Sequence, residues 1–290
     1  MHAVNLEGEP FVGQADAINK IELWHNNESF PHFLIITGEK GSGRKTLATI
    51  FAKSLDSRIT LLSEVNTESV RRIVDGAYDI ESKMVYIIPD ADKLYASASN
   101  SLLKLTEEPP LNGYIIMTLL SLENTLATLV SRSHHIELDI YTQSELNELS
   151  ENGLYSKIST NPGMLKAFER LGEITVKELI DFCEKFVSHI GTVSIVNALK
   201  SVSKLKLKES DTGFELDMFF ACIRYVLNEV FETYMKGSIE SGGININHLS
   251  IWYSLLSIYN YAFNRAGVNK RAVLDQFIFN IRKSLKEGVA

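Results

Sequence analysis

The stretch that decides the fold covers residues 33–46 and reads FLIITGEKGSGRKT. Its first five residues are an apolar run typical of a buried strand, and a glycine-rich turn follows it and leads into a segment with helical spacing of apolar residues. In this order, glycines let backbone N–H groups converge on phosphate oxygens at a helix N-terminus. The stretch therefore predicts a phosphate-binding loop, and the alternative is a plain glycine-rich turn without a ligand.

The predicted loop departs from an active one at two positions. An active loop reads G-x-x-x-x-G-K-[ST], whereas Arg44 stands where the lysine belongs and Lys45 where the magnesium-binding hydroxyl belongs. Lys45 and Thr46 would serve as that pair only in a register shifted by one residue, which rotates a helix by about 100°. We favour the unshifted register, because it starts the apolar face of the helix at Leu47.

The first 140 residues alternate apolar runs with helical patterns. The predicted strands are residues 33–37, 59–62, 84–88, 114–117 and 135–138, and predicted helices include 67–78 and 99–107. Short runs buried on both faces and separated by helices indicate a parallel sheet covered on both sides.

Beyond residue 138 the patterns are helical. We expect two or three short helices in residues 144–171, followed by helices at 176–190, 193–207, 214–234, 248–266 and 271–285. The predicted fold class is α/β plus all-α, with a P-loop NTPase-like domain at 1–140, a small helical domain at 141–174 and an all-helical domain at 175–290.

Composition excludes several classes of protein. Of 290 residues, 45% are hydrophobic and 22% charged, as in globular proteins. No apolar run approaches the ~18 residues of a membrane span, and the first residues do not resemble a signal peptide. A net charge of −7 argues against a strong grip on DNA by this chain alone.

Metal sites are not indicated either. The two cysteines form no C-x-x-C pair, so neither a zinc site nor a disulfide framework is expected, and free buried thiols suit the cytoplasm. His134 and His135 are adjacent on a predicted strand and would face opposite sides of the sheet, so they cannot share a metal.

The third predicted strand ends in an altered acidic motif. A nucleotide-hydrolysing site usually ends this strand in Asp-Glu, for the magnesium shell and the attacking water. Here Pro89 holds the first position and Asp90 the second. Proline has no carboxylate and Asp90 is shorter than glutamate, so hydrolysis is not expected. An ordinary strand end capped by Asp90 and Asp92 is compatible with the same residues.

The order of these motifs resembles the AAA+ clamp-loader family, and within it the delta-prime group of bacterial DNA polymerase III. The matching residues are Val12-Gly13-Gln14, Pro31-His32, 38–46, Val70-Arg71, Asp90-Ala91-Asp92-Lys93, the run NSLLKLTEEPP at 100–110, Thr118 and Ser131-Arg132-Ser133. The resemblance is strong over residues 11–138, while the later helices agree with the family by pattern rather than by motif.

The resemblance implies a function for the whole chain. Such a subunit helps to load the sliding clamp on primed DNA within a cytoplasmic, hetero-oligomeric complex of the DNA polymerase holoenzyme. Residues 141–174 would be a lid and 175–290 a collar that joins the subunits. Arg132, flanked by Ser131 and Ser133, would act as an arginine finger in a neighbouring ATP site.

The implied nucleotide site is degenerate, so no cofactor is certain, weak ATP or ADP binding is the most that we expect, and no zinc is implied. Its candidate residues are Val12, Gly13, Gly38, Gly41, Ser42, Gly43, Arg44, Lys45, Thr46, Asp90 and Thr118. Lys166 is either a phosphate-contacting base or a solvated lysine.

Two other functions remain open. An active AAA+ ATPase would use Lys45-Thr46 in the shifted register. A small-molecule kinase would leave the helical half of the chain unexplained.

Overall fold

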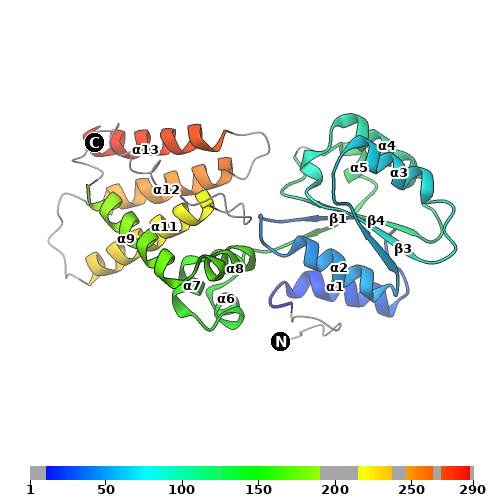
Figure 1. Ribbon diagram of the computed structural model, residues 1–290, viewed down its shortest axis with the longest axis horizontal. Coiled ribbons are helices and arrows are strands. Elements are labelled where there is room, and N and C mark those ends of the chain that lie inside the picture. Colours follow the sequence, from blue (N-terminus) through cyan, green and yellow to red (C-terminus); the bar gives the residue numbers. More distant parts are fainter. Residues whose placement is uncertain (1–10, 124, 190–214, 237–245, 264–268, 288–290) are drawn as a thin grey trace. The chain divides into compact units, whose positions relative to one another are not determined.

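The computed structural model describes residues 11–123, 125–189, 215–236, 246–263 and 269–287 (Figure 1). The chain divides into two compact units, Met1–Glu145 and Leu146–Ala290. The helix predicted for residues 193–207 lies outside the described residues.

The N-terminal unit is a five-stranded parallel sheet with helices on both faces. Its elements are α1 (Ala15–Asn26), β1 (Phe33–Thr37), α2 (Arg44–Ser54), β2 (Arg58–Leu61), α3 (Thr67–Gly76), β3 (Met84–Ile88), the 3₁₀ helix η1 (Ala91–Lys93), α4 (Ala96–Glu107), β4 (Gly113–Leu119), α5 (Ala127–Val130) and β5 (His134–Glu137). The strand order is β2-β3-β4-β1-β5, and every neighbouring pair is parallel. All five predicted strands are therefore present in one sheet.

Alternation along the central strand β1 builds two cores. Leu34 and Ile36 pack with α1 and α2 on one face of the sheet, whereas Phe33 and Ile35 pack with α3, α4 and α5 on the other. Figure 1 shows these two helical layers on opposite sides of the strands. Because successive side chains of a strand point to opposite faces, an uninterrupted apolar strand requires cover on both sides.

The prediction that every strand is buried on both faces is wrong at the two edges of the sheet. All four residues of β2 are exposed, and only Ile136 of β5 is buried. An edge strand has a neighbouring strand on one side only, so its side chains receive less cover than those of β1 or β4. Both β1 and β4 are buried along their whole length.

The strand order places the glycine-rich loop at a break in the topology. The chain leaves β1 for the distant edge strand β2, and β1 is flanked in the sheet by β4 and β5. In open α/β sheets, ligands bind outside the carboxyl ends of the strands at such a switch point. The loop of residues 38–43 directly follows the carboxyl end of β1.

The C-terminal unit is helical throughout its described residues. α6 (Gln143–Leu149) crosses the boundary between the units, and α7 (Gly153–Ile158), α8 (Pro162–Leu171), α9 (Glu173–His189), α11 (Glu215–Met235), α12 (Ile246–Phe263) and α13 (Lys270–Glu287) follow it. Side chains of α7 and α8 share one buried cluster with those of α9, α11, α12 and α13. The separation of residues 141–174 as a lid and 175–290 as a collar stays a prediction.

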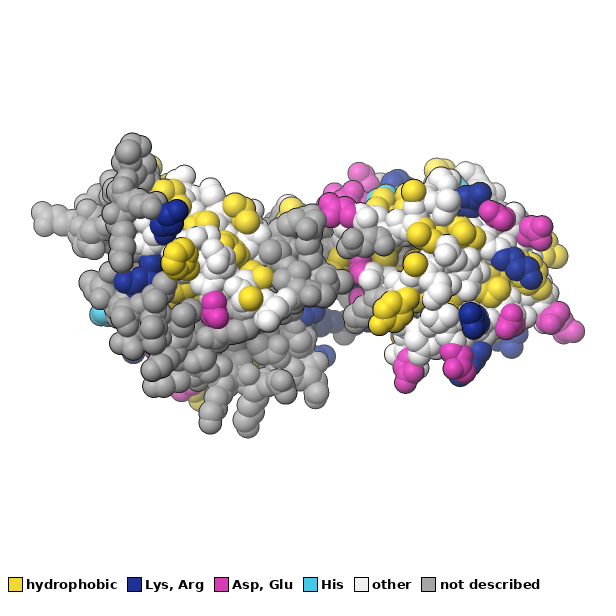
Figure 2. Space-filling model, turned by 90° about the horizontal axis from the view of Figure 1, so that it is seen from above, with side chains coloured by type: hydrophobic (Ala, Val, Ile, Leu, Met, Phe, Trp, Pro, Cys, Tyr) yellow, Lys and Arg dark blue, Asp and Glu magenta, His cyan; other side chains and the backbone are white. Residues whose placement is uncertain are grey.

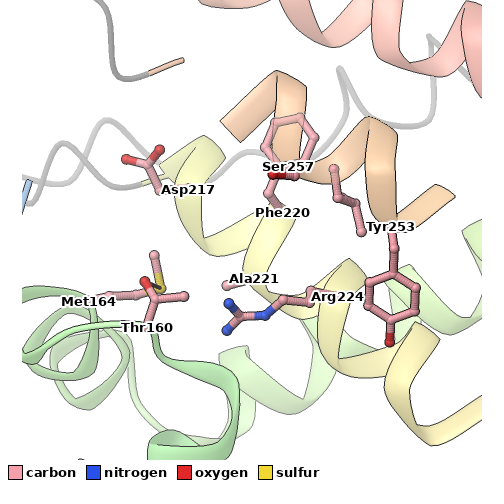
Figure 3. A pocket seen from close by; sticks show the side chains of 9 residues that line it. Thr160, Met164, Asp217, Phe220, Ala221, Arg224, Tyr253 and Ser257 are labelled. Atoms are coloured by element: carbon pink, nitrogen blue, oxygen red, sulfur yellow. Dashed lines mark hydrogen bonds between the residues drawn. The ribbon is translucent and has the colours of Figure 1, made fainter. Parts of the chain in front are cut away.

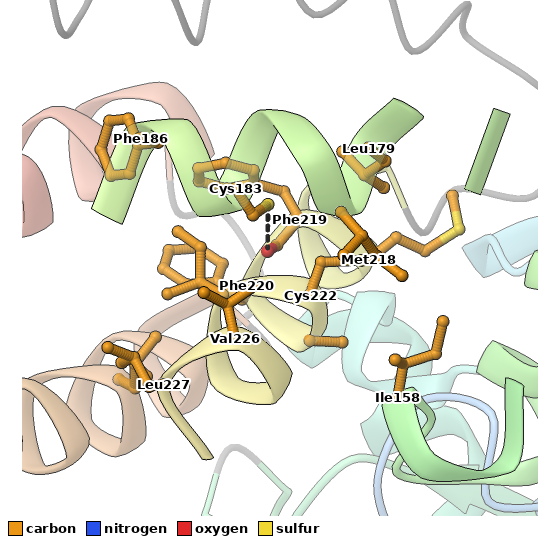
Figure 4. Packing of buried hydrophobic residues seen from close by; sticks show 14 of the residues in the cluster. Ile158, Leu179, Cys183, Phe186, Met218, Phe219, Phe220, Cys222, Val226 and Leu227 are labelled. Atoms are coloured by element: carbon orange, nitrogen blue, oxygen red, sulfur yellow. Dashed lines mark hydrogen bonds between the residues drawn. The ribbon is translucent and has the colours of Figure 1, made fainter. Parts of the chain in front are cut away.

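Both cysteines lie in that cluster as free, buried thiols, as the sequence indicates. Figure 4 shows Cys183 of α9 directed at the backbone of α11, where its Sγ lies 4.0 Å from the carbonyl oxygen of Phe219. Burial, together with the neighbouring thiol of Cys222, raises the pKa of Cys183 well above its ordinary value. The pair therefore contributes as small apolar side chains. No helix among the described residues is both long and apolar enough to cross a bilayer.

The aromatic contacts of Phe51, a residue of α2, give a prediction about stability. Phe51 has no exposed surface and meets Trp24 and Phe30 edge to face, at ring-centre distances of 6.0 and 5.3 Å. Phe51→Ala should lower the free energy of unfolding of the N-terminal unit by about 3–5 kcal/mol. Leu23→Ala on α1, where the side chain is 58% exposed, is the control and should cost less than about 0.5 kcal/mol. Equal losses in urea unfolding would contradict the assigned core.

Candidate functional site

The glycine-rich loop ends where α2 begins, and its last residue has to be a glycine. Gly43 is the N-cap of α2 with a φ of 96°, and a Cβ built there would lie 2.9 Å from the ring of Phe11. Because of the positive φ and the close approach of Phe11, any larger residue at position 43 would strain the backbone and clash with that ring. The first turn of α2 then directs Arg44 and Leu47 into the protein, and the exposed Lys45 and Thr46 away from it. This burial pattern agrees with the unshifted register.

An ion pair between a buried arginine and a half-buried aspartate lies beside the candidate phosphate site. Arg44 is only 6% exposed, and its Nη2 lies 3.4 Å from Oδ1 of Asp90, at the end of β3. Burial lowers the pKa of Arg44, and the negative charges of Asp90 and Asp92 oppose that effect. Arg44, at the position predicted for the loop lysine, therefore engages Asp90, at the position predicted for the glutamate.

Lys45 joins the same carboxylate from outside. Its Nζ lies 3.3 Å from Oδ2 of Asp90, although 54% of its side chain is exposed. The side chain of Lys45 is thus exposed while its amine stays at the carboxylate of Asp90. Asp90 consequently has a cation on each of its two oxygens.

Neighbouring strands hold the backbone around Asp90. The hydroxyl of Thr118, fully buried on β4, accepts a hydrogen bond of 3.0 Å from the N–H of Asp90. The carboxylate of Asp92 accepts the N–H of Leu120 at 2.9 and 3.0 Å. Burial raises the pKa of Asp92, while this hydrogen bond and the charge of Arg44 lower it. β4 and the residue after it thus hold Asp90 through its backbone N–H and Asp92 through its carboxylate.

A second group of contacts fixes the opposite side of the loop. The hydroxyl of Tyr141, which is buried, donates to the carbonyl oxygen of Ser42 at 3.0 Å. Gln14 exchanges two hydrogen bonds with the backbone of Asp139, at 2.8 and 2.7 Å. A Cβ built on Gly13 would lie 2.5 Å from Oε1 of Glu145. Val12-Gly13-Gln14, which the resemblance makes the predicted adenine-side motif, therefore lies against the segment that follows β5.

Two polar atoms of the loop are buried without a hydrogen-bond partner, namely Oγ of Ser42 and Nη1 of Arg44. A phosphate oxygen would satisfy such groups. Of the remaining predicted loop residues, Gly38 and Gly41 both adopt positive φ angles, of 154° and 90°.

Arg132 lies in a separate place, after the short helix α5. Its side chain is 37% exposed; Nη1 donates to the carbonyl oxygen of Thr128 at 2.9 Å, and Nη2 lies 3.1 Å from Oε1 of Glu107. The hydroxyls of Ser131 and Ser133 donate to the carbonyls of Thr128 and Val130. The three residues thus end α5 by satisfying its last carbonyls.

The remaining candidate residues are two histidines of β5 and Lys166. His135 forms a hydrogen bond of 2.8 Å with Oγ1 of Thr37, whereas the ring of His134 lies beside Trp24. No metal cluster occurs among the described residues. Lys166 is exposed on α8 in the C-terminal unit, and its proposed role stays a prediction. On the face seen in Figure 2, basic and acidic side chains of the N-terminal unit are interspersed.

The C-terminal unit also contains a pocket of about 240 Å³, lined by side chains of α8, α11 and α12 and by Thr160. Figure 3 shows Asp217 and Arg224 projecting from α11 at this pocket. The guanidinium of Arg224 donates to the carbonyl oxygens of Ile158 and Ser159, at 3.3 and 3.5 Å. That arginine therefore ties α11 to the end of α7.

Sequence reasoning missed three contributors to these sites, namely Phe11, Glu107 and Tyr141, whereas the capping by Asp92 agrees with the strand end expected from the sequence. Phe11 precedes the predicted adenine-side motif directly, and Glu107 belongs to the run that carries the resemblance. Tyr141 has no sequence signal, because its role depends on the meeting of segments 99 residues apart.

Comparisons with known proteins agree with this geometry. A family model described as DNA polymerase III, delta subunit matches residues 63–141. The gamma subunit of DNA polymerase III from Buchnera aphidicola subsp. Schizaphis graminum is 26% identical over 165 residues, which are 47% of this chain and 46% of that protein. The tau subunit from Bacillus subtilis is 21% identical over 216 residues, 64% of this chain and 38% of that protein.

Among solved structures, a DNA polymerase III gamma subunit-related protein from Thermotoga maritima aligns with a TM-score of 0.49 and 15% identity, over 91% of this chain and 99% of that one. The chain spans about half the length of the curated relatives it matches.

The matches support a clamp-loader-type AAA+ chain. The predicted fold class, α/β plus all-α with a parallel-sheet domain followed by helices, is confirmed. The narrower delta-prime assignment stays a prediction, because the family model names a delta subunit and the relatives are gamma and tau subunits.

The hydroxyl of Tyr141 gives a prediction for the loop. Tyr141→Phe leaves the carbonyl of Ser42 without its donor and should lower the free energy of unfolding by about 1–2 kcal/mol near pH 7. Burial raises the pKa of Tyr141 to about 12, above its ordinary value of about 10. This contribution is therefore complete below about pH 10 and is lost as the pH rises towards 12.

Urea unfolding of both proteins at pH 7 and pH 11.5 measures this difference, which should shrink at the higher pH. Tyr95→Phe is the control, because Tyr95 is 77% exposed. A difference that is the same at both pH values would contradict the assigned hydrogen bond.

Proposed function

We propose that the chain is a clamp-loader subunit of the delta-prime type. It joins related AAA+ subunits, does not hydrolyse ATP itself, and lends Arg132 to the ATP site of a neighbour. Through that assembly it acts on the sliding clamp and primed DNA, in the cytoplasm.

One observation carries the proposed loss of hydrolysis: Asp90 holds the position of the catalytic glutamate, and its two oxygens face Arg44 and Lys45 in the first turn of α2. A general base has to be within reach of the water that it activates. Asp90 is instead committed to Arg44 and Lys45, so that a bound nucleotide would meet no base in this chain.

Magnesium lacks its usual partners for the same reason. The position of the loop hydroxyl is Lys45, and the first position after β3 is Pro89. The ammonium group of Lys45 would repel a divalent cation, and Pro89 offers such a cation no side-chain ligand. The orphaned polar atoms of Ser42 and Arg44 remain compatible with weak binding of a phosphate group without turnover.

Arg132 has the properties that a finger requires. It is part-exposed, follows a helix of only four residues, and its backbone is fixed by the flanking serines. A guanidinium stays charged at any working pH and presents a planar fork of donors that suits a phosphate. These features support the proposed action in trans.

Exposed apolar side chains support assembly through the C-terminal unit. Four large ones on α9, α11, α12 and α13 remain 51–78% exposed, namely Ile174, Met235, Ile258 and Phe279. Contact with similar subunits would cover such surface.

An active ATPase is the second candidate function. The amine of Lys45 lies close to Asp90, so a shifted register would need Lys45 to leave that carboxylate. ATP hydrolysis that depends on Lys45 would establish this alternative.

Arg132→Ala tests the proposed function. A sole arginine finger is worth about 10³-fold or more in rate, but a loader with several ATP sites should lose less, about tenfold in the ATPase and clamp-loading rates of the reconstituted complex. Arg132→Lys keeps the charge without the fork and should be impaired too. The assay uses saturating clamp and primed DNA.

Folding and assembly are the controls. Arg132→Ala should change stability by less than about 0.5 kcal/mol, and gel filtration should show the variant in the complex. Unchanged rates with normal incorporation would show that Arg132 is only a surface residue.

A further inference from the structure

The tip of Arg132 is held by a carboxylate from the helix on the same face of the sheet. Glu107 is the last residue of α4, and its Oε1 lies 3.1 Å from Nη2 of Arg132. The other terminal nitrogen, Nη1, donates to the carbonyl oxygen of Thr128 at 2.9 Å. The guanidinium is therefore held at two nitrogens, by a side chain and by the backbone of α5.

These two contacts leave part of the group available. A guanidinium has five N–H donors in one rigid plane; the hydrogen bond to Thr128 uses one donor of Nη1, and the carboxylate of Glu107 lies beside Nη2 as an ion-pair partner. The remaining donors lie in that same plane, so an incoming phosphate would meet a fork whose orientation is already set. Arginine otherwise has many rotamers, and fixing it in advance lowers the entropy lost when each hydrogen bond forms.

Stability does not explain the ion pair. The side chains of Arg132 and Glu107 are 37% and 55% exposed, and pairs with so much solvent contact contribute little to folding. What the pair does determine is where the guanidinium points.

The next residue offers a contrast. Glu108 carries the same charge and is also exposed, but it follows the end of α4, and the contact that it provides is its backbone carbonyl, which accepts from the hydroxyl of Tyr78 at 2.9 Å. Of these two neighbouring glutamates, Glu107 is the one whose side chain forms the ion pair with Arg132.

We propose that Glu107 is the positioning residue of Arg132, holding its guanidinium plane in the orientation that a neighbouring subunit's phosphate requires. This inference rests on the proposed function. Glu107 acts through Arg132 and touches no reacting atom.

The test is a double-mutant cycle in the reconstituted complex. Residues in direct contact couple by enough to change a rate about fivefold. Glu107→Ala should therefore lower the kcat of the clamp- and DNA-stimulated ATPase about fivefold, less than Arg132→Ala does, and leave the KM for ATP unchanged. Glu107→Gln removes the charge of the ion pair and should lower the rate as Glu107→Ala does, while Glu108→Ala should match the unmodified protein.

In the Arg132→Ala background, Glu107→Ala should have no further effect, because no guanidinium remains to be positioned. Melting temperatures and incorporation into the complex should be the same for all variants. A rate for Glu107→Ala that equals or exceeds that of the unmodified protein would overturn the positioning role, as would an additive loss in the double variant.

The two proposals fail in different ways. If Arg132→Ala is slow but Glu107→Ala is not, the positioning role is wrong and the finger stands. If Arg132→Ala leaves the rates unchanged, both are wrong.

Discussion

A positive charge buried at the first turn of α2 constrains the whole end of the sheet at which a nucleotide would bind. Arg44 is 6% exposed, and Asp90 at the end of β3 is the carboxylate that compensates it. A buried charge without its partner is strongly destabilising, so the loop, α2 and the end of β3 have to stay together. Thr118 of β4 holds the backbone of Asp90, which extends the constraint to a third strand. The ion pair between Arg44 and Asp90, which stabilises the fold here, therefore engages the two residues at the positions that nucleotide hydrolysis would need.

The N-terminal unit therefore separates two roles that an active AAA+ subunit combines. Around the loop, the side chains bind one another: Arg44 and Lys45 bind Asp90, and Tyr141 binds the carbonyl of Ser42. Beyond α5, the chain instead presents Arg132 with part of its side chain in solvent. The same sheet thus supports a glycine-rich loop whose flanking charges pair with one another and, after α5, a part-exposed arginine, which is the arrangement that the proposed function requires.

The sequence predicts the layers of this fold well because its signals are local. Apolar runs mark β1 and β3 at their observed bounds, and the glycine pattern marks the loop. The exposure of β2 was not predictable, because edge and central strands share similar short runs. Glu107 as the partner of Arg132 and Tyr141 as the donor to Ser42 depend on contacts between distant segments. A single sequence contains no information on such pairings, whereas burial of Arg44 follows from its spacing to Leu47.

Single-turnover ATP hydrolysis by the isolated chain with magnesium shows whether the glycine-rich loop supports catalysis in this chain. With enzyme in excess over ATP, product should form no faster than in buffer, and Lys45→Ala should make no difference. Phosphate release above background that disappears in Lys45→Ala would contradict the account, because it would show that Lys45 leaves Asp90 and serves an active site in the shifted register.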